Sequence, residues 1–177
     1  MSRPTLRTER LLLTPLGPEH TDLLVELDSD PEVMRFLTGR ASTRAEVVET
    51  WLPRRTDPHH DRRGLGYWVA HVEEEFVGWF CLTPRPDPMV AELGYRLRRA
   101  AWGRGLAVEG AGAVVRHGFD TLGLATVVAE TMAVNAPSRR VMERLGMRHV
   151  ATEVREWDDP LPGAELGEVG YELRRDG

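Results

Sequence analysis

A glycine-rich stretch, AAWGRGLAVEGAG at residues 100–112, lies between a segment with strand character and a segment with helical character. Its four glycines fall where a helix has to begin, although glycine is a poor helix former. The first amides of a helix are unpaired, and glycines let a phosphate approach them closely. The stretch therefore predicts an α/β chain that binds a phosphate-bearing ligand. A flexible turn before a closely packed helix explains the stretch alone equally well.

Two common phosphate-binding motifs do not fit this stretch. A P-loop requires Lys and then Ser or Thr after its last glycine, whereas Gly105 is followed by Leu106 and Ala107. The dinucleotide-binding fingerprint requires a third glycine at the position of Val108. A nucleotide-binding protein of either class is therefore not expected.

The composition is that of a soluble globular protein, and 177 residues are enough for one domain, expected to span residues 1–177. A net charge of -5 without a long basic block argues against a nucleic-acid partner. No segment resembles a signal peptide or a membrane span, so we expect a cytoplasmic protein without a membrane partner. The single cysteine, Cys81, lies in an apolar run and is predicted to be buried. His59 and His60 are adjacent without a third spaced ligand, so no metal site is predicted.

The hydrophobic pattern predicts a mixture of strands and helices. Thr43, followed by Glu46, is typical of a helix start, and Pro53 is expected to stop that helix. The basic pairs in the polar segment 54–64 are predicted to be solvated on an exposed loop. The predicted strands are residues 5–14, 66–72, 75–82, 90–97, 126–132, 147–154 and 167–174, and the predicted helical segments follow Pro18 and cover residues 31–37, 43–51, 107–121 and 135–146.

One hydroxyl on the last predicted helix faces the apolar interior. Ser138 shares a helix face with Val141, Met142 and Leu145, which follow it at offsets of three, four and seven. A hydroxyl in that position needs a partner, either a backbone carbonyl of the preceding turn or a ligand. Asn135 lies at the start of the same helix, where capping is its expected role.

Together these segments resemble the GNAT acetyltransferase superfamily, in particular its ribosomal-protein N-terminal-acetyltransferase-like branch. The resemblance covers nearly the whole chain and rests on TERLLL, DPEVMRFL, ELGYRLRRAAWGRGLAVEGA and NAPSRRVMERLGM in this order. It implies an α/β (α+β) fold with a mixed, mostly antiparallel central sheet of about seven strands flanked by helices. The fourth and fifth strands, ELGYRL and TVVAETM, are expected to splay apart and admit acetyl-CoA.

The resemblance also implies contacts to acetyl-CoA as co-substrate. The amides of residues 103–107 would hold the pyrophosphate, backbone groups of the fourth strand would follow the pantetheine arm, and Asn135 would bind pantetheine. Trp102 differs from the Arg or Gln that the general pattern has at this position, although tryptophan resembles the branch. The implied cofactor-binding residues are Leu97, Arg98, Trp102, Gly103, Arg104, Gly105, Leu106, Ala107, Asn135 and Ser138.

Three side chains are candidates for catalysis. Glu130 matches the position of a general base in related enzymes, where partial burial would raise the pKa of the carboxyl group, and Glu92 is the second candidate. The alternative for either residue is a solvated strand glutamate, and for Glu92 alone this alternative is favoured. Many relatives carry a tyrosine where this chain has Met142, so Ser138 is expected to donate a hydrogen bond to the departing thiolate. A backbone amide near Leu97 would stabilise the developing oxyanion.

The expected function is direct acetyl transfer from acetyl-CoA to a primary amine, either a protein N-terminus or a small molecule, in a ternary complex. The alternative is a non-catalytic acyl-CoA sensor. Segments 28–60 and 157–167 are expected to select the acceptor. Asp158 and Asp159 in the second segment either favour a cationic amine or are solvated loop charges. The chain is expected to be a monomer or a homodimer.

Overall fold

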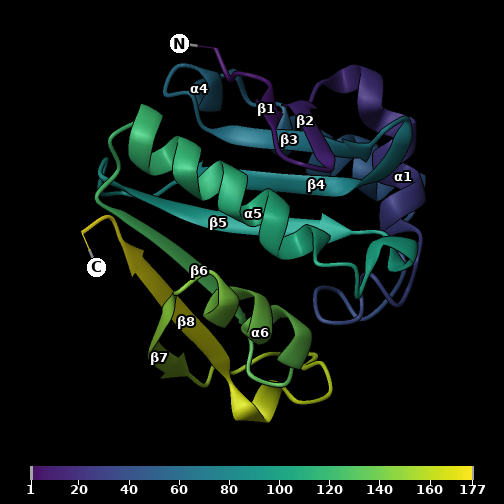
Figure 1. Ribbon diagram of the computed structural model, residues 1–177. Helices are drawn as coiled ribbons and strands as arrows, with labels where there is room; N and C mark the ends of the chain where they lie inside the picture. The colour runs from purple at the N-terminus through teal and green to yellow at the C-terminus, as the bar shows by residue number, and fades with distance from the viewer. Residues whose placement is uncertain (1, 177) are drawn as a thin grey trace.

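The computed structural model describes residues 2–176, which contain an eight-stranded sheet in the order β1-β2-β3-β4-β5-β6-β8-β7 (Figure 1). Neighbouring strands are antiparallel except for β5 and β6, which are parallel. The mixed, mostly antiparallel α/β sheet is therefore confirmed. The strands are β1 (Leu6–Arg7), β2 (Leu11–Pro15), β3 (Gly66–Val72), β4 (Glu75–Pro84), β5 (Val90–Leu97), β6 (Thr126–Met132), β7 (Arg148–Glu153) and β8 (Glu168–Arg174).

The eighth strand arises because the predicted first strand folds into two. A tight turn closes at Thr8, whose amide donates to the Leu11 carbonyl at 3.0 Å while the Leu11 amide donates to Thr8 Oγ1 at 2.9 Å. The side chain of Thr8 thus replaces a strand partner and ends β1. The strands predicted as fourth and fifth are consequently β5 and β6.

The helices cover both faces of the sheet, with α5 and α6 on one face in Figure 1. Alternation along β4 separates two apolar clusters. Phe80 packs on one face with Leu106 and Val114 of α5, whereas Trp79 packs on the other face with Leu24 of α1. The helices are α1 (Thr21–Asp28), α2 (Arg44–Glu46), α3 (Leu52–Arg55), α4 (Pro58–Asp61), α5 (Leu106–Arg116) and α6 (Ala136–Arg144), with π-helical turns η2 (Val47–Trp51) and η4 (His117–Thr121) and 3-10 turns η1 (Pro18–His20), η3 (Arg99–Ala101) and η5 (Ala164–Leu166).

The helix that begins at Thr43 differs from its prediction at its end. Its capping box is present, with the Glu46 amide donating to Thr43 Oγ1 at 3.2 Å. Pro53 does not stop the helix, which continues to Arg55. The preceding π-helical turn, in which the Leu52 amide bonds to the Val47 carbonyl, widens the backbone ahead of the proline ring and removes the clash of a regular α-helix.

The predicted exposed loop at residues 54–64 is also only partly a loop. It contains the short helix α4, which the Asp57 side chain caps by accepting from the His59 amide at 2.8 Å. Arg55, predicted to be solvated, has only 3% of its surface exposed. Its burial follows from its position at the end of α3, where it faces the Trp79 cluster rather than solvent.

Helix α5 lies close to the sheet at Gly110, where a Cβ atom would overlap the ring of Phe80. Glycine at this position therefore allows α5 to pack closely on β4. Gly112 differs, because a Cβ there would meet only Arg116 Nη1 at 3.4 Å and Leu145 Cδ2 at 3.8 Å. None of the helices between residues 2 and 176 combines the length and apolar character that crossing a bilayer requires.

Candidate active site

The strands β5 and β6 pair over only three positions and then separate. Pairing runs from Val90↔Thr126 to Glu92↔Val128, whereas β5 continues to Leu97 and β6 to Met132. Figure 1 shows the two parts of the sheet diverging beyond this point. The predicted splay is confirmed, and it leaves backbone groups of both strands without a sheet partner on the facing edges.

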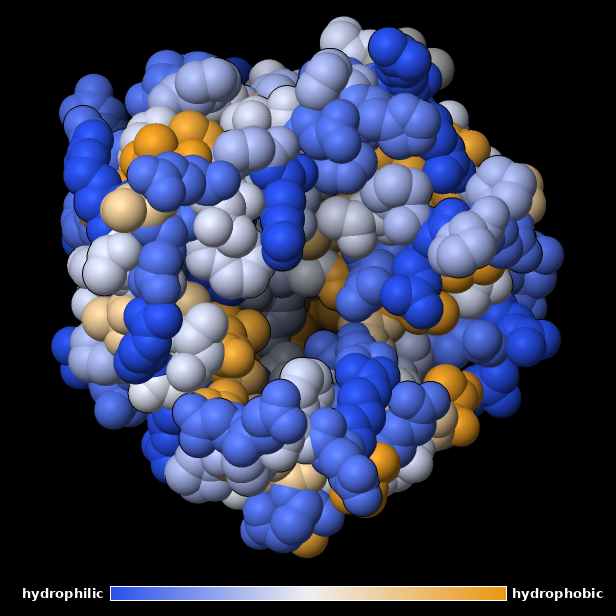
Figure 2. All heavy atoms as spheres, turned by 180° about the vertical axis from the view of Figure 1, so that it is seen from behind, coloured by the Kyte–Doolittle hydropathy of each residue, from blue (hydrophilic) through white to orange (hydrophobic). Residues whose placement is uncertain are grey.

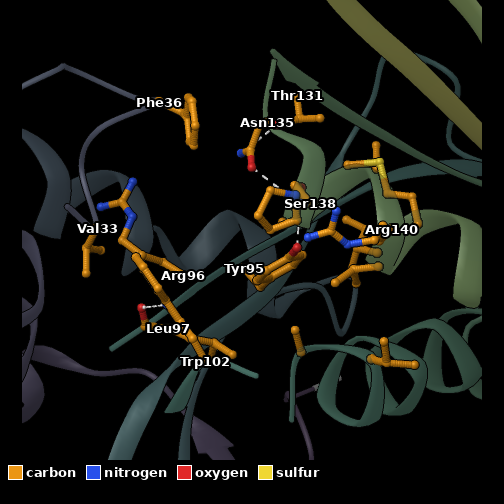
Figure 3. Close-up of a pocket in the computed structure, with 18 of the residues that line it drawn as sticks. Val33, Phe36, Tyr95, Arg96, Leu97, Trp102, Thr131, Asn135, Ser138 and Arg140 are labelled. Atoms are coloured by element: carbon orange, nitrogen blue, oxygen red, sulfur yellow. Dashed lines mark hydrogen bonds between the residues drawn. The ribbon is translucent and has the colours of Figure 1, made fainter. Parts of the chain in front are cut away.

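A cleft of about 860 Å³ occupies this region. It is bounded by residues 32–37, β5, the start of α5, β6 and α6. Seen from the side opposite to α5 and α6, the molecule is hollowed, with an apolar floor and a hydrophilic rim (Figure 2). In Figure 3, Tyr95, Ser138 and Arg140 gather on one side of the pocket, while Arg96 and Val33 lie on the other.

The glycine-rich loop forms one end of the cleft. Gly103 and Gly105 have φ angles of 70° and 77°, in the left-handed region that glycine tolerates best. A Cβ at Gly103 would meet no atom within 4 Å, so the backbone conformation and not crowding within the protein requires glycine there. Helix α5 starts at Leu106 without a side-chain cap from residues 2–176. Its first amides are thus available to an anion, as the sequence predicted.

A side chain of α5 braces this loop against the N-terminal hairpin. Glu109 accepts from Thr8 Oγ1 at 2.6 Å, from the Arg10 amide at 2.8 Å and from Arg10 Nε at 2.7 Å. Arg10 Nη1 also donates to the Arg104 carbonyl at 2.8 Å. Burial opposes the ionisation of Glu109, but these hydrogen bonds outweigh it and lower the pKa of the carboxyl group. Sequence reasoning missed this brace, because its partners are about a hundred residues apart.

Helix α6 places Asn135 and Ser138 on the other side of the cleft. Asn135 Oδ1 caps the helix by accepting from the Ser138 amide at 3.3 Å, and its Nδ2 donates to Thr131 Oγ1 at 3.1 Å. The half-buried Ser138 hydroxyl accepts from the Tyr95 hydroxyl at 3.3 Å. The Ser138 oxygen therefore has a partner that the sequence did not indicate, a tyrosine of β5. Burial raises the pKa of Tyr95, while its hydrogen bond to Ser138 acts in the opposite direction.

Near the end of β5, only some of the residues predicted to contact the cofactor line the cleft. Leu97 lines the cleft, but its carbonyl accepts from the indole Nε1 of Trp102 at 2.9 Å. The Arg98 amide donates to the Val77 carbonyl at 2.9 Å, and its guanidinium bonds to the Phe76 carbonyl and to Glu26. Arg98 therefore faces away from the cleft, because the sheet register assigns its backbone to β4. Trp102 lies at the mouth of the cleft and is 48% exposed.

Both candidate bases border the cleft, and each is held by an arginine. Glu130 accepts from Arg155 Nη1 at 2.8 Å and from Nη2 at 3.2 Å, and its side chain is 41% exposed. The predicted role of Glu130 relied on partial burial of its carboxylate. The structure instead places this carboxylate in an exposed ion pair. Glu92 pairs with Arg85 Nη1 at 2.9 Å, with 35% of its side chain exposed. The hydrogen bonds that Arg155 donates to Glu130 and then to Glu153 raise the pKa of Arg155.

The single cysteine, Cys81, lies on β4. Cys81 is buried, and burial, followed by the charge of Glu92, raises the pKa of its thiol to about 12. Across residues 2–176, no three His, Cys, Asp or Glu side chains are grouped as metal ligands.

The sequence model of the family described as "Acetyltransferase (GNAT) domain" matches residues 10–148. The chain belongs to the GNAT acetyltransferase family. An Aspergillus fumigatus protein, FsC-acetyl coenzyme A-N(2)-transacetylase, is 43% identical over 99% of this chain and 78% of its own length. The protein is accordingly an acyltransferase, and its family uses acetyl-CoA as co-substrate.

Solved structures of GNAT proteins share the fold. A Bacillus anthracis GNAT acetyltransferase has a TM-score of 0.81 at 22% identity, covering 98% of this chain and 100% of its own. RimL, a ribosomal L7/L12 alpha-N-protein acetyltransferase solved in complex with coenzyme A, also has a TM-score of 0.81, at 17% identity, covering 97% and 98%. These structures therefore confirm the GNAT fold of the chain.

Several cleft residues escaped sequence reasoning. Tyr95 is part of the quoted ELGYRL motif, yet nothing local indicates that it meets α6. Arg140 and Arg144, which do not share the apolar face of their helix, also line the cleft. The end of β5 lies beside the predicted splay, and strand alternation directs Tyr95 and Arg96 to opposite faces there. Both residues could therefore have been expected along the cleft.

Proposed function

We propose that this GNAT protein, acting as one domain over residues 1–177, transfers an acetyl group from acetyl-CoA directly to a primary amine in a ternary complex. The observation that carries the proposal is the meeting of the glycine loop, Tyr95 and Ser138 along a single splayed cleft. The N(2) in the name of the Aspergillus relative supports a nitrogen acceptor. The acceptor is either a protein N-terminus or a small amine.

The residues that line the cleft fit acetyl-CoA. The unpaired amides at the start of α5 suit a pyrophosphate, since they combine hydrogen-bond donors with the positive end of the helix dipole. Asn135, although engaged in capping, retains acceptor and donor capacity toward an amide of the pantetheine arm. Arg140 and Arg144 add positive charge at the cleft for further phosphate groups.

Acetyl transfer requires three functions, each of which a residue of the chain can supply. A carboxylate, Glu130 or Glu92, takes the proton of the acceptor ammonium, directly or through water. A β5 backbone amide near Leu97 stabilises the negative charge that grows on the thioester oxygen. Ser138 gives a hydrogen bond to the departing thiolate, and Tyr95, which donates to Ser138 Oγ, stabilises the serine as its proton shifts toward sulfur.

Release of the free CoA thiol tests the proposal. Acetyl-CoA would be incubated with a panel of peptides, polyamines, aminoglycosides and amino acids, and the thiol would be followed with Ellman's reagent. Acceptor-dependent release, with a product 42 Da heavier by mass spectrometry as expected for an acetyl group, supports the enzyme. Binding of acetyl-CoA without release on any acceptor supports the alternative, a non-catalytic acyl-CoA sensor.

A further inference from the structure

Two arginines share one buried carboxylate beneath the cleft. Asp28 is fully buried, and its Oδ1 and Oδ2 accept from Arg96 Nη1 at 2.6 Å and from Arg55 Nη2 at 3.1 Å. Arg55 and Arg96 are themselves 3% and 9% exposed. We call Asp28, Arg55, Arg96 and Trp79 the arginine cluster. Its three charged groups leave one positive charge in excess, and burying an unbalanced charge is costly.

The rest of the protein compensates this charge only in part. The face of Trp79 lies 5.0 Å from the Arg55 guanidinium and 5.1 Å from that of Arg96, which stabilises both cations. Burial and then the charge of Arg96 lower the pKa of Arg55, while Asp28 acts against them. Nearby carboxylates pair elsewhere: Glu26 with Arg98, Asp30 with Arg99 and Glu92 with Arg85.

The cluster also holds unused hydrogen-bond donors. Arg55 Nη1, Arg96 Nε and Trp79 Nε1 are buried and find no partner among residues 2–176. An unpaired buried donor costs free energy, so three of them together indicate a missing acceptor. All three belong to side chains that are more than nine-tenths buried.

The cluster faces the part of the cleft opposite to Ser138. Arg96 and Trp79 line the main cleft and also a second cavity of about 430 Å³, which is bounded further by Met34, Leu37 and Thr83. In Figure 3 the Arg96 guanidinium lies near Val33, across the pocket from Tyr95 and Ser138. Asn135, Ser138 and Arg140, to which cofactor contacts are assigned above, lie across the pocket from the Arg96 guanidinium, so the region around this guanidinium is left for the acceptor.

We propose that the acceptor carries a carboxylate, which binds to Arg96 and the Trp79 indole while its amine faces the thioester. This inference rests on the proposed acetyl transfer. A carboxylate has the acceptor oxygens that the unused donors lack and the charge that balances the two guanidiniums. The cluster therefore selects against polyamines. Asp158 and Asp159, which the sequence offered as determinants for a cationic amine, are exposed loop residues that do not line the cleft.

Binding of two product-like probes tests the inference without turnover. N-acetylglycine and N-acetylglycinamide differ only in the carboxylate, and calorimetry in the presence of CoA would measure the affinity of each. We expect the acid to bind wild-type protein about tenfold to a hundredfold more tightly, the range of a charge-assisted hydrogen bond. Equal affinities, or no binding of N-acetylglycine, would overturn the inference, and this comparison needs no variant.

Variants then locate the carboxylate. Arg96→Gln is expected to abolish the preference for the acid, whereas Arg44→Gln, at an exposed arginine paired with Asp22, is expected to retain it. Arg96→Lys serves if the glutamine variant does not fold, and it should weaken the preference because lysine lacks the planar fork. An unchanged preference in a folded Arg96 variant contradicts the inference.

The two proposals can fail separately. Acetylation of amines together with equal binding of the acid and amide probes overturns the carboxylate inference and leaves acetyl transfer intact. Preferential binding of the acid without CoA release on any acceptor supports the cluster as a carboxylate site and counts against acetyl transfer.

Discussion

The Tyr95 hydroxyl donates to Ser138 Oγ at 3.3 Å and thereby links β5 to α6 across the splayed cleft. The Tyr95 ring is kept in place beside Phe80, with ring centroids 6.0 Å apart. A hydroxyl held in this way is oriented before substrate binds, which lowers the cost of placing it near a reacting sulfur. Met142, at the position where many relatives carry a tyrosine, cannot donate a proton.

Ser138→Ala is expected to lower kcat by about tenfold to a hundredfold, because the thiolate then leaves without a hydrogen-bond donor. The affinity for acetyl-CoA, measured by calorimetry, should change little. Tyr95→Phe keeps the ring packing and is expected to cause a smaller decrease in kcat. If both variants keep the wild-type turnover number, Ser138 has no role in the chemical step.

Replacing each carboxylate with the corresponding amide distinguishes the two candidate bases. Glu130→Gln is expected to lower kcat by about a hundredfold. Glu92→Gln, measured with the same acceptor, should have a smaller effect. The reverse order would assign the base to Glu92, and an unchanged kcat in both variants would point to water.

Glu109→Gln is expected to loosen the glycine loop, since its bonds to Thr8 and Arg10 are charge-assisted. The free energy of unfolding should fall by about 1 to 2 kcal/mol at neutral pH. The folded protein lowers the pKa of Glu109 below its usual 4.5, so this stability is fully present above pH 4.5 and is lost as the pH falls through the folded pKa. Acetyl-CoA should also bind more weakly.

Chemical denaturation at several pH values measures the effect of Glu109→Gln. Glu156→Gln, at an exposed glutamate, provides the control and should match wild type. A loss of stability that stays constant down to strongly acidic pH would show that the carboxylate charge is not responsible.

Gly110→Ala is expected to destabilise the protein by about 1 to 3 kcal/mol, because its methyl group would overlap the Phe80 ring. Gly112→Ala places the same group against the flexible end of Arg116 and gains helix propensity. Its stability should therefore equal or exceed that of wild type. Thermal unfolding of the pair measures both effects, and equal losses would contradict the packing at Gly110.

Cys81 is expected to resist Ellman's reagent in the folded protein at neutral pH, because its thiol is buried and has a pKa of about 12. It should react once the protein is unfolded in guanidinium. Incubation with acetyl-CoA alone should likewise leave no acetyl-enzyme by mass spectrometry. Rapid labelling of the folded protein would contradict the burial of Cys81, and a covalent acetyl group would contradict direct transfer.

Local chemistry made most of the fold predictable. Short apolar segments bounded by turns indicated β3, β4 and β5, and Asn135 with Pro137 indicated the start of α6, because strand character and capping depend on near neighbours. The errors also have local causes. The Thr8 side chain ends β1, and a π-helical turn allows the helix to continue past Pro53.

The site was predictable as a set of backbone features but not as a set of side-chain contacts. The residue type of Gly103 and Gly105 is compatible with their left-handed conformations, and the residue type of Asn135 predicts its capping role. Nothing near Glu130 in the sequence indicates Arg155, which reaches it from the loop that follows β7.

The sequence by itself determined the order of strands and helices, the glycine loop and the family, since each depends on residues that are close along the chain. Only the tertiary structure decided which distant side chains meet. Arg55 and Arg96 lie 27 and 68 residues from Asp28, and Tyr95 lies 43 residues from Ser138. These pairs form because strand register and helix packing bring their backbones together, and no local pattern encodes that proximity.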